Sequence, residues 1–367
     1  MFLNGTFHGL YTVNFSKDEY LFNIKKNQTN RDALIYANQW GDSTRLQTHI
    51  PYNISYPWEL VWSSTADSGV EGNAWISDSF NKMIDFLADA SDEEFVNNIS
   101  NYVNIYRAID SMLLTIATNA SDNYSKNILW VKQDGKQWIP SVYDLDSTFG
   151  LRWDGVLAIG SDAYLAKTEN VLWSRLYDNF YEEIVARWGV LRNGPLSIFN
   201  IDKRFVDFHN MIPANFYNLE HKKWTNIPSA TSNNIAQITK WTIEHLHNLD
   251  QAFGVLIDEP TPFNIQLNTD EGLSVKSYLT KDFSRVSFEE SYAFSRDKNT
   301  GYLSTKKGDY FFEINLDESL EIDNIIVTGN YGKLLNPNET NTNNIYRLSE
   351  IDSDVVITIT TKQKTIF

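Results

Sequence analysis

The spacing of hydrophobic residues changes several times along the chain, and each spacing predicts a different kind of structure. From Phe2 to about Ile50, short alternating runs predict strands in "TFHGLYTVNF", "EYLFNIK" and "ALIYA". An Asn-Gly pair near the start predicts a hairpin turn. The stretch from Gly41 to Gly72 is rich in Trp, Pro and Ser and has no clear period, which predicts an ordered loop.

Helical spacing begins at Ser77 and continues to Ala117. In "SDSFNKMIDFLADA", the apolar residues Phe80, Ile84 and Leu87 share one face. The next segment, "SDEEFVNNISNYVNIYRAIDSMLLTIA", opens with Ser and Asp followed by acids, which is typical of the first turn of a helix. The two segments together predict a helix pair.

A short apolar hairpin follows the helix pair. The runs "NILWVKQ" and "WIPSVYDLD" predict two strands joined by Asp134-Gly135. After Gly150 the spacing is helical again in "ENVLWSRLYDN", "FYEEIVARWGVLRN", "SIFNIDKRFVDFHNMI" and "NIAQITKWTIEHLHNLDQAF". Two prolines in "DEPTPF", residues 258–263, end this helical region.

The remaining residues alternate like strands. The runs "FNIQLN", "SVKSYLT", "RVSFEE", "YFFEINL", "NIIVTG" and "VVITITT" are separated by Gly, Asn and Asp turns. They predict an all-β module of the small sandwich type. The fold class is therefore α+β, with a first domain over residues 1–258 and a second over residues 263–367.

Composition narrows the class of protein. The chain has 367 residues, of which 42% are hydrophobic, so it can bury a sizeable core. A net charge of −16 argues against nucleic acid as a partner, because phosphate backbones are bound by Lys and Arg clusters. There is no cysteine, no apolar run of about 18 residues to insert into a membrane and no basic, apolar leader of a signal peptide.

Two polar residues between the helix pair and the hairpin have a spacing that suggests chemistry. Asp122 and Asn127 are five apart in a loop that leads from a helix to a strand. In the catalytic loop of protein kinases, an Asp orients the acceptor hydroxyl and an Asn five residues later holds magnesium. The alternative is a solvated turn in which Asp122 serves as a cap.

A second pair of acids follows the hairpin. On a strand, Asp144 and Asp146 point to the same side, so their carboxylates converge. Like charges that lie close together repel unless a cation neutralises them, and magnesium binds through one or two carboxylates plus phosphate oxygens. The alternative is two acids at a solvated strand end.

The segment "NILWVKQDGKQWIPSVYDLDSTFG" closely resembles the signature of the CotH kinase family, in which a D-x-D-x-T-x-G segment follows two strands. "LNGTFHGLYTV" resembles the hairpin of that family, with Phe7 in place of its first Tyr. The resemblance covers about residues 2–258. The family's earlier segment has no counterpart here, so we expect that the N-terminal part of the kinase-like domain is missing.

The resemblance implies an atypical, secreted-type protein kinase with a partial N-lobe and a mostly helical C-lobe. Carried over by position, Asp122 is the catalytic-loop Asp, Asn127 is a metal ligand, and Asp144 and Asp146 hold magnesium against ATP. For the lysine that contacts the phosphates, the candidates are Lys25 and Lys26, which end a predicted strand. The alternative is an exposed lysine on an edge strand.

Two other features are assigned no chemistry. His245 and His247 face different directions on a predicted helix, which is poor zinc geometry, and we expect them at the surface. The aromatic run from Trp40 to Trp62 is interpreted as core, the alternative being a platform on which sugars stack.

The leading hypothesis is a magnesium-dependent kinase that uses ATP to phosphorylate a protein hydroxyl. The rival hypothesis is an inactive kinase-like scaffold in a surface adhesin or a phage tail, which binds a host surface or glycans through its β module. Both predict an extracellular, surface or virion location, with a protein phosphoacceptor or a surface partner. The oligomeric state is left open.

Overall fold

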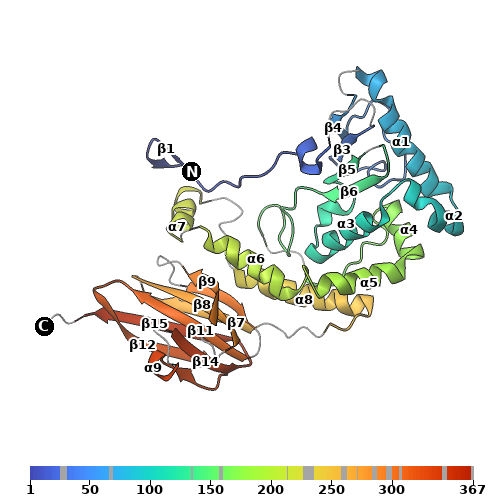
Figure 1. The fold of residues 1–367 in the computed structure, drawn as a ribbon. Helices are drawn as coiled ribbons and strands as arrows, with labels where there is room; N and C mark the ends of the chain where they lie inside the picture. Colours follow the sequence, from blue (N-terminus) through green and yellow to red (C-terminus); the bar gives the residue numbers. More distant parts are fainter. Residues whose placement is uncertain are drawn as a thin grey trace. The chain divides into compact units, whose positions relative to one another are not determined.

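The computed structural model describes residues 1–24, 31–65, 69–133, 135–156, 160–212, 214–225, 235–257, 263–270, 272–282, 287–294, 300–305, 308–340 and 345–364. The chain forms two compact units (Figure 1). The first unit consists of residues 1–12, 194–243 and 258–367, and the second of residues 13–193 and 244–257. The boundary expected at residues 258–263 falls mostly outside the described residues and stays a prediction.

A four-stranded antiparallel sheet is the centre of the second unit, with the strand order β4-β3-β5-β6 (Figure 1). The β5-β6 hairpin and the strand "ALIYA" confirm the predicted strands. Strand β4 lies inside the segment expected to be a loop, so that expectation was wrong. The strand was hidden because it has apolar residues on both sides instead of an alternating pattern. The bounds are β3 (Ala33–Ala37), β4 (Trp58–Ser63), β5 (Ile128–Lys132) and β6 (Trp138–Val142).

Both faces of this sheet are covered. On one face, Phe80 of helix α1 meets the ring edges of Trp58, Trp130 and Trp138 at centroid distances of 5.2, 5.2 and 5.0 Å. On the other face, a second buried cluster is formed by Ile24, Leu34, Tyr36, Leu129 and Val131. Burial on both sides explains why these strands are almost continuously hydrophobic.

The predicted helix pair is three helices. The first begins earlier than expected, and the long second segment is interrupted by a 3-10 turn at Ile99–Asn101, after which Asn104 caps a new helix. The predicted helices beyond Gly150 are confirmed. The bounds are α1 (Gly69–Asp89), α2 (Asp92–Asn98), α3 (Ile105–Thr118), α4 (Val171–Asn179), α5 (Tyr181–Arg192), α6 (Ile198–Asn210) and α8 (Ile235–Phe253).

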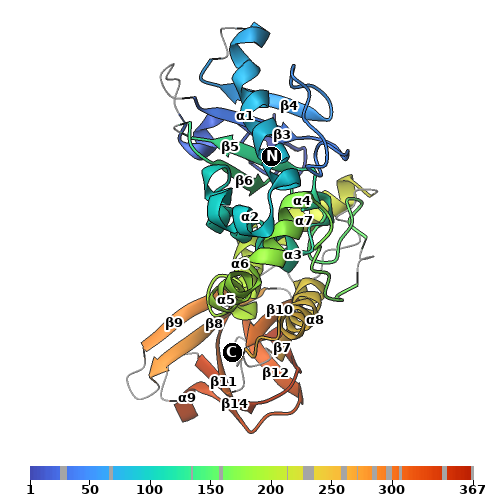
Figure 2. The ribbon, with the colours of Figure 1, turned by 90° about the vertical axis from the view of Figure 1, so that its right-hand side faces the viewer.

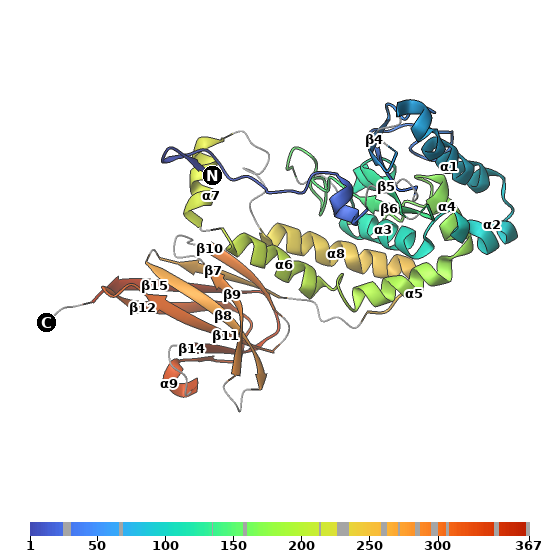
Figure 3. The same cartoon turned by 45° about the horizontal axis from the view of Figure 1, so that its top comes forward.

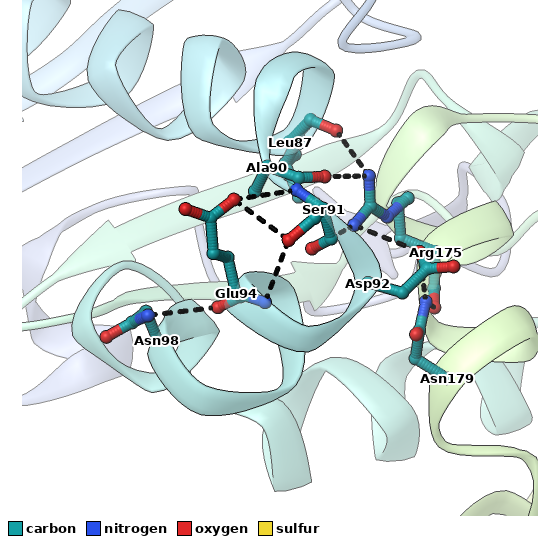
Figure 4. Close-up of polar contacts among 8 residues, drawn as sticks. All are labelled: Leu87, Ala90, Ser91, Asp92, Glu94, Asn98, Arg175 and Asn179. Atoms are coloured by element: carbon teal, nitrogen blue, oxygen red, sulfur yellow. Dashed lines mark hydrogen bonds and ion pairs between the residues drawn. The ribbon is translucent and has the colours of Figure 1, made fainter.

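The junction between α1 and α2 is held by side chains bonded to backbone groups (Figure 4). The helix start expected at Ser91 or Asp92 is confirmed, and Ser91 and Glu94 form a capping box, with the Glu94 side chain 3.0 Å from the Ser91 amide. Arg175 of α4 donates to the carbonyl of Ala90 at 2.8 Å and pairs with Asp92. The carbonyls at the end of α1, which have no partner within the helix, are therefore satisfied by a guanidinium.

Helix α5 is joined to the C-terminal part of α8 by a buried ion pair, and the two helices lie side by side in Figures 1 and 3. Arg192 Nε and Nη2 donate to the carboxylate of Asp250 at 3.0 and 3.1 Å. Trp188 Nε1 donates to the same carboxylate at 2.8 Å. Arg192 is fully buried and Asp250 is nearly so.

The N-terminal segment differs from the expectation. The Asn-Gly turn is present, with Asn4 and Gly5 at positive φ, but the strands that flank it, β1 (Phe2–Leu3) and β2 (Thr6–Phe7), are only two residues long. The run "EYLFNIK" is not a strand where it is described, because Glu19–Phe22 is a 3-10 helix. Its local caps outweigh the alternating pattern: Asp18 accepts the Tyr20 amide, and Asn23 is left-handed.

The first unit contains two further sheets, with the orders β10-β7-β15-β12 and β13-β14-β11-β8-β9 (Figure 2). One buried cluster takes side chains from both sheets, including Ile265, Phe312 and Ile357. Six strands lie at the predicted runs, whereas β10, β13, β14 and helix α7 (Ala214–Lys223) were not predicted. The strand bounds are β7 (Phe263–Thr269), β8 (Leu273–Asp282), β9 (Ser287–Phe294), β10 (Thr300–Thr305), β11 (Gly308–Leu316), β12 (Leu320–Gly329), β13 (Leu334–Leu335), β14 (Ile345–Ile351) and β15 (Val355–Gln363).

Candidate active site

The loop after α3 carries the first of the four predicted residues. Asn119 ends α3 in the left-handed conformation, and its amide donates to the Ile116 carbonyl. A 3-10 turn, Ser121–Tyr124, follows and contains Asp122. Asp122 is half-buried, and its carboxylate forms an ion pair with Lys126 at 2.8 Å. The sequence argument did not single out Lys126, although it lies inside the Asp122 to Asn127 spacing.

Asn127 is fixed by hydrogen bonds to both its backbone and its side chain. It is buried, and its backbone is left-handed with φ 55°, which Asn tolerates better than most residues. Its amide donates to the carbonyl of Ala37 at 2.7 Å, and its carbonyl accepts the amide of Tyr143 at 2.9 Å. Its side-chain Oδ1 accepts the hydroxyl of Tyr36 at 2.8 Å. Asn127 is therefore tied both to β3 and to the residue before Asp144.

The reason given for the convergence of Asp144 and Asp146 was wrong. Strand β6 ends at Val142, so neither Asp is on a strand, and Asp144 has a left-handed backbone with φ 56°. The two side chains nevertheless interact through their charge. Burial of its carboxyl raises the pKa of Asp144 first, and the charge of Asp146 raises it further.

The charges of three segments meet at Asp144. The carboxylate of Asp122 also raises the pKa of Asp144, whereas Lys126 and Lys17 lower it. Three aspartates and two lysines thus share one electrostatic field, which is the arrangement expected where a cation or a phosphate binds. Lys17 was missed in the sequence because it stands in an irregular segment with no pattern around it.

Lys17 lies against the sheet. Its Nζ is 4.1 Å from the centroid of the Tyr36 ring, and it pairs with Glu59 of β4. The two lysines proposed from the sequence, Lys25 and Lys26, lie outside the described residues. Lys17 is thus the lysine that the described part of the chain brings near Asp144 from the side of β3 and β4.

Tyr36 connects this lysine to Asn127. Burial, followed by the negative charges of Asp144 and, more weakly, Glu59 and Asp122, raises the pKa of Tyr36 to about 12. Its hydroxyl therefore stays protonated at physiological pH and donates to Asn127.

The side chains proposed as magnesium ligands are Asp144, Asp146 and Asn127. Among the described residues, no group of three or more His, Cys, Asp or Glu side chains is arranged to hold a metal ion. Magnesium in kinase sites is held by one or two carboxylates, and phosphate oxygens complete its shell. Asp144 and Asp146 fit that requirement, since a cation between them would relieve the repulsion that raises the pKa of Asp144. Oδ1 of Asn127 has one lone pair engaged by Tyr36 and a second one to offer.

The two features that were assigned no chemistry also differ from expectation. His245 is fully buried and not at the surface, because α8 turns this side toward α3, whereas His247 is half-buried. In the aromatic run, Trp58 is core, but Trp40 and Tyr56 are exposed, so the interpretation as core holds for only part of it.

Comparison with known proteins assigns the class. Residues 1–249 match the family described as CotH kinase protein. The chain therefore belongs to the CotH kinase protein family and is a kinase-like protein. A search of curated proteins found no match. Within the described ranges, no helix is long and apolar enough to cross a membrane.

Proposed function

We propose that the chain is a magnesium-dependent protein kinase that transfers the γ-phosphate of ATP to a protein hydroxyl. The observation that supports this most is the shared field of Asp122, Asp144 and Asp146 beside Lys17 and Lys126. A scaffold gains nothing from bringing like charges together, since their repulsion costs stability. The proposal includes kinase-like lobes for the N-terminal domain and a sandwich for the C-terminal module.

Each residue of the site has a proposed role. Asp122 orients the acceptor hydroxyl, and its ion pair with Lys126 holds the carboxylate in place. Asp144, Asp146 and Asn127 would hold magnesium, which neutralises charge on the transferring phosphate when it is bound. Lys17 takes the phosphate-contacting role first assigned to Lys25 or Lys26, because Glu59 and the Tyr36 ring orient its ammonium group.

The rival function is an inactive kinase-like scaffold in a surface adhesin or a phage tail. It is favoured by the lack of a group of three metal-type side chains in the part of the chain that the structure describes. Under either function we propose an extracellular, surface or virion location and a protein partner, with no role for nucleic acid because the net charge is −16.

Thermal unfolding with and without ATP and magnesium tests the proposal. At a concentration about 100 times Kd, a ligand stabilises the folded state by about 2.7 kcal/mol. For a unit of this size, that raises the unfolding midpoint by about 5–10 °C. We expect the rise to require both ATP and magnesium and to disappear in Asp144→Asn.

Two further variants make the result specific. Asp122→Asn should keep most of the nucleotide shift but lose phosphate transfer, since Asp122 is assigned to the acceptor. Asp89→Asn, an exposed aspartate on α1, is the matched control and should behave as the wild type. No magnesium-dependent shift in the wild-type chain at millimolar ATP would favour the scaffold.

A further inference from the structure

His245 is a buried, titratable side chain to which the proposed function assigns no role. It lies on α8 with no exposed surface, and each ring nitrogen faces a backbone carbonyl. Nε2 is 2.8 Å from the oxygen of Ile116, and Nδ1 is 3.1 Å from the oxygen of Ser161. The imidazole therefore bridges the last turn of α3 and the segment around Ser161.

Burial holds the ring in its neutral form. Desolvation lowers the pKa of His245, and backbone hydrogen bonds offset this only in part. A neutral imidazole has one N–H group, and the shorter contact assigns it to Nε2, which donates to Ile116. At neutral pH the ring therefore donates a hydrogen bond to the end of α3.

Neighbouring residues of α8 bind Ser161, which lies on the other side of the imidazole ring. Asn248 Nδ2 donates to the Ser161 carbonyl at 2.9 Å, and the hydroxyl of Ser161 donates to Glu244 at 3.1 Å. Three residues of α8, Glu244, His245 and Asn248, therefore contact a single residue of an irregular segment. These contacts fix the position of Ser161 on α8.

Both bridged segments lead directly to the candidate site. Asn119 and the turn with Asp122 follow the end of α3. The segment of Ser161 follows Asp144 and Asp146 in the chain and packs on the same turn, with the rings of Tyr164 and Tyr124 5.5 Å apart. Closer to the aspartates, the amide of Phe149 donates to the carbonyl of Thr118 at 2.8 Å.

We propose that His245 is a positioning residue: by bonding the end of α3 beside Ser161, it keeps the loop of Asp122 and the segment after Asp146 in one relative arrangement. This inference rests on the proposed function for its consequence, since the turn that contains Asp122 follows α3 and the Ser161 segment packs on that turn through Tyr164 and Tyr124. His245 itself touches neither aspartate. Its effect passes through the backbone of α3 and of the Ser161 segment.

Amide hydrogen exchange and nucleotide titration on the full chain test this proposal. His245→Leu fills the space without a donor, so the Ile116 carbonyl loses its bond from the ring and keeps the one from the Asn119 amide. We expect faster exchange at both Thr118–Tyr124 and Ser161–Tyr164, and magnesium-dependent ATP affinity about tenfold weaker. His245→Gln, whose amide reaches about as far as Nε2, should restore both. His247→Leu, on the same helix and half-buried, is the matched control.

The outcomes separate the possible roles. If His245→Leu lowers the unfolding midpoint but leaves exchange at Thr118–Tyr124 and ATP affinity unchanged, the residue only stabilises the core and the proposal is overturned. If amide exchange rises at both segments but the wild type binds no nucleotide, the positioning role of His245 is supported and the proposed function fails. If His245→Leu does not fold, Asn248→Ala takes its place, because it loosens the same Ser161 carbonyl without emptying the core. Unchanged exchange at Ser161–Tyr164 in that variant would also overturn the proposal, because the contacts from α8 would then not determine where that segment lies.

Discussion

The buried pair of Arg192 and Asp250 allows a quantitative prediction about stability. Two nitrogens of the guanidinium lie 3.0 and 3.1 Å from the carboxylate, and Trp188 donates to it as well. Both charged groups are nearly or fully removed from solvent. Replacing Asp250 by Asn keeps the size of the side chain but removes the carboxylate charge that the buried guanidinium of Arg192 faces.

Breaking a buried ion pair from one side costs about 3–5 kcal/mol, because the remaining charge is desolvated and unpaired. We expect Asp250→Asn and Arg192→Met each to lose an amount in this range, which corresponds to a fall in midpoint of roughly 6–20 °C. The double variant Arg192→Met with Asp250→Leu removes both charges together. It should lose much less than the sum of the single losses.

Urea unfolding followed by tryptophan fluorescence measures these free energies, with the exposed pair Lys203 and Asp207 as the matched control. Removal of that pair should change stability by less than about 1 kcal/mol. A loss below about 1 kcal/mol in Asp250→Asn, or a double variant that loses the full sum, would refute the reasoning. Either result would mean that the pair is effectively solvated.

Three further predictions concern protonation and local bonding. Burial lowers the pKa of Lys132 to about 8, so above pH 8 the folded state binds fewer protons than the unfolded state. The free energy of unfolding should therefore rise from pH 8 to pH 10, by up to about 3 kcal/mol. This rise should be missing in Lys132→Met. The lowered pKa of His245 acts with the same sign at lower pH. Stability should fall as the pH drops below about 6.5, where the unfolded state takes up the proton first, and His245→Gln should flatten that fall in urea titrations at pH 5 and pH 7. Arg175→Met should lower the free energy of unfolding by about 1–3 kcal/mol, since the carbonyls at the end of α1 lose their donor, while Arg107→Met on the exposed start of α3 should not.

Local signals in the sequence were sufficient for several elements of the fold. The β5-β6 hairpin was predictable because Asp134-Gly135 favours a tight turn between two apolar runs. The start of α2 was predictable because Ser91 and Glu94 satisfy each other's backbone groups within one turn. The proposal of a site at Asp122, Asn127, Asp144 and Asp146 came from residue types and spacing alone, and the strand geometry used to bring the last two together was wrong.

The surroundings of the site depend on contacts between distant residues. Lys17 approaches Asp144 because the segment before β3 crosses the face of Tyr36, and nothing near Lys17 in the sequence marks that position. His245 is buried because α8 presents it to α3, more than a hundred residues earlier in the chain. Hydrogen bonds within a turn act over a few residues and leave a pattern there, whereas burial and charge depend on which surfaces meet. The kinase-like class was therefore readable from the order of the amino acids, and the partners of each charged side chain in the proposed site were determined by the packing of the folded chain.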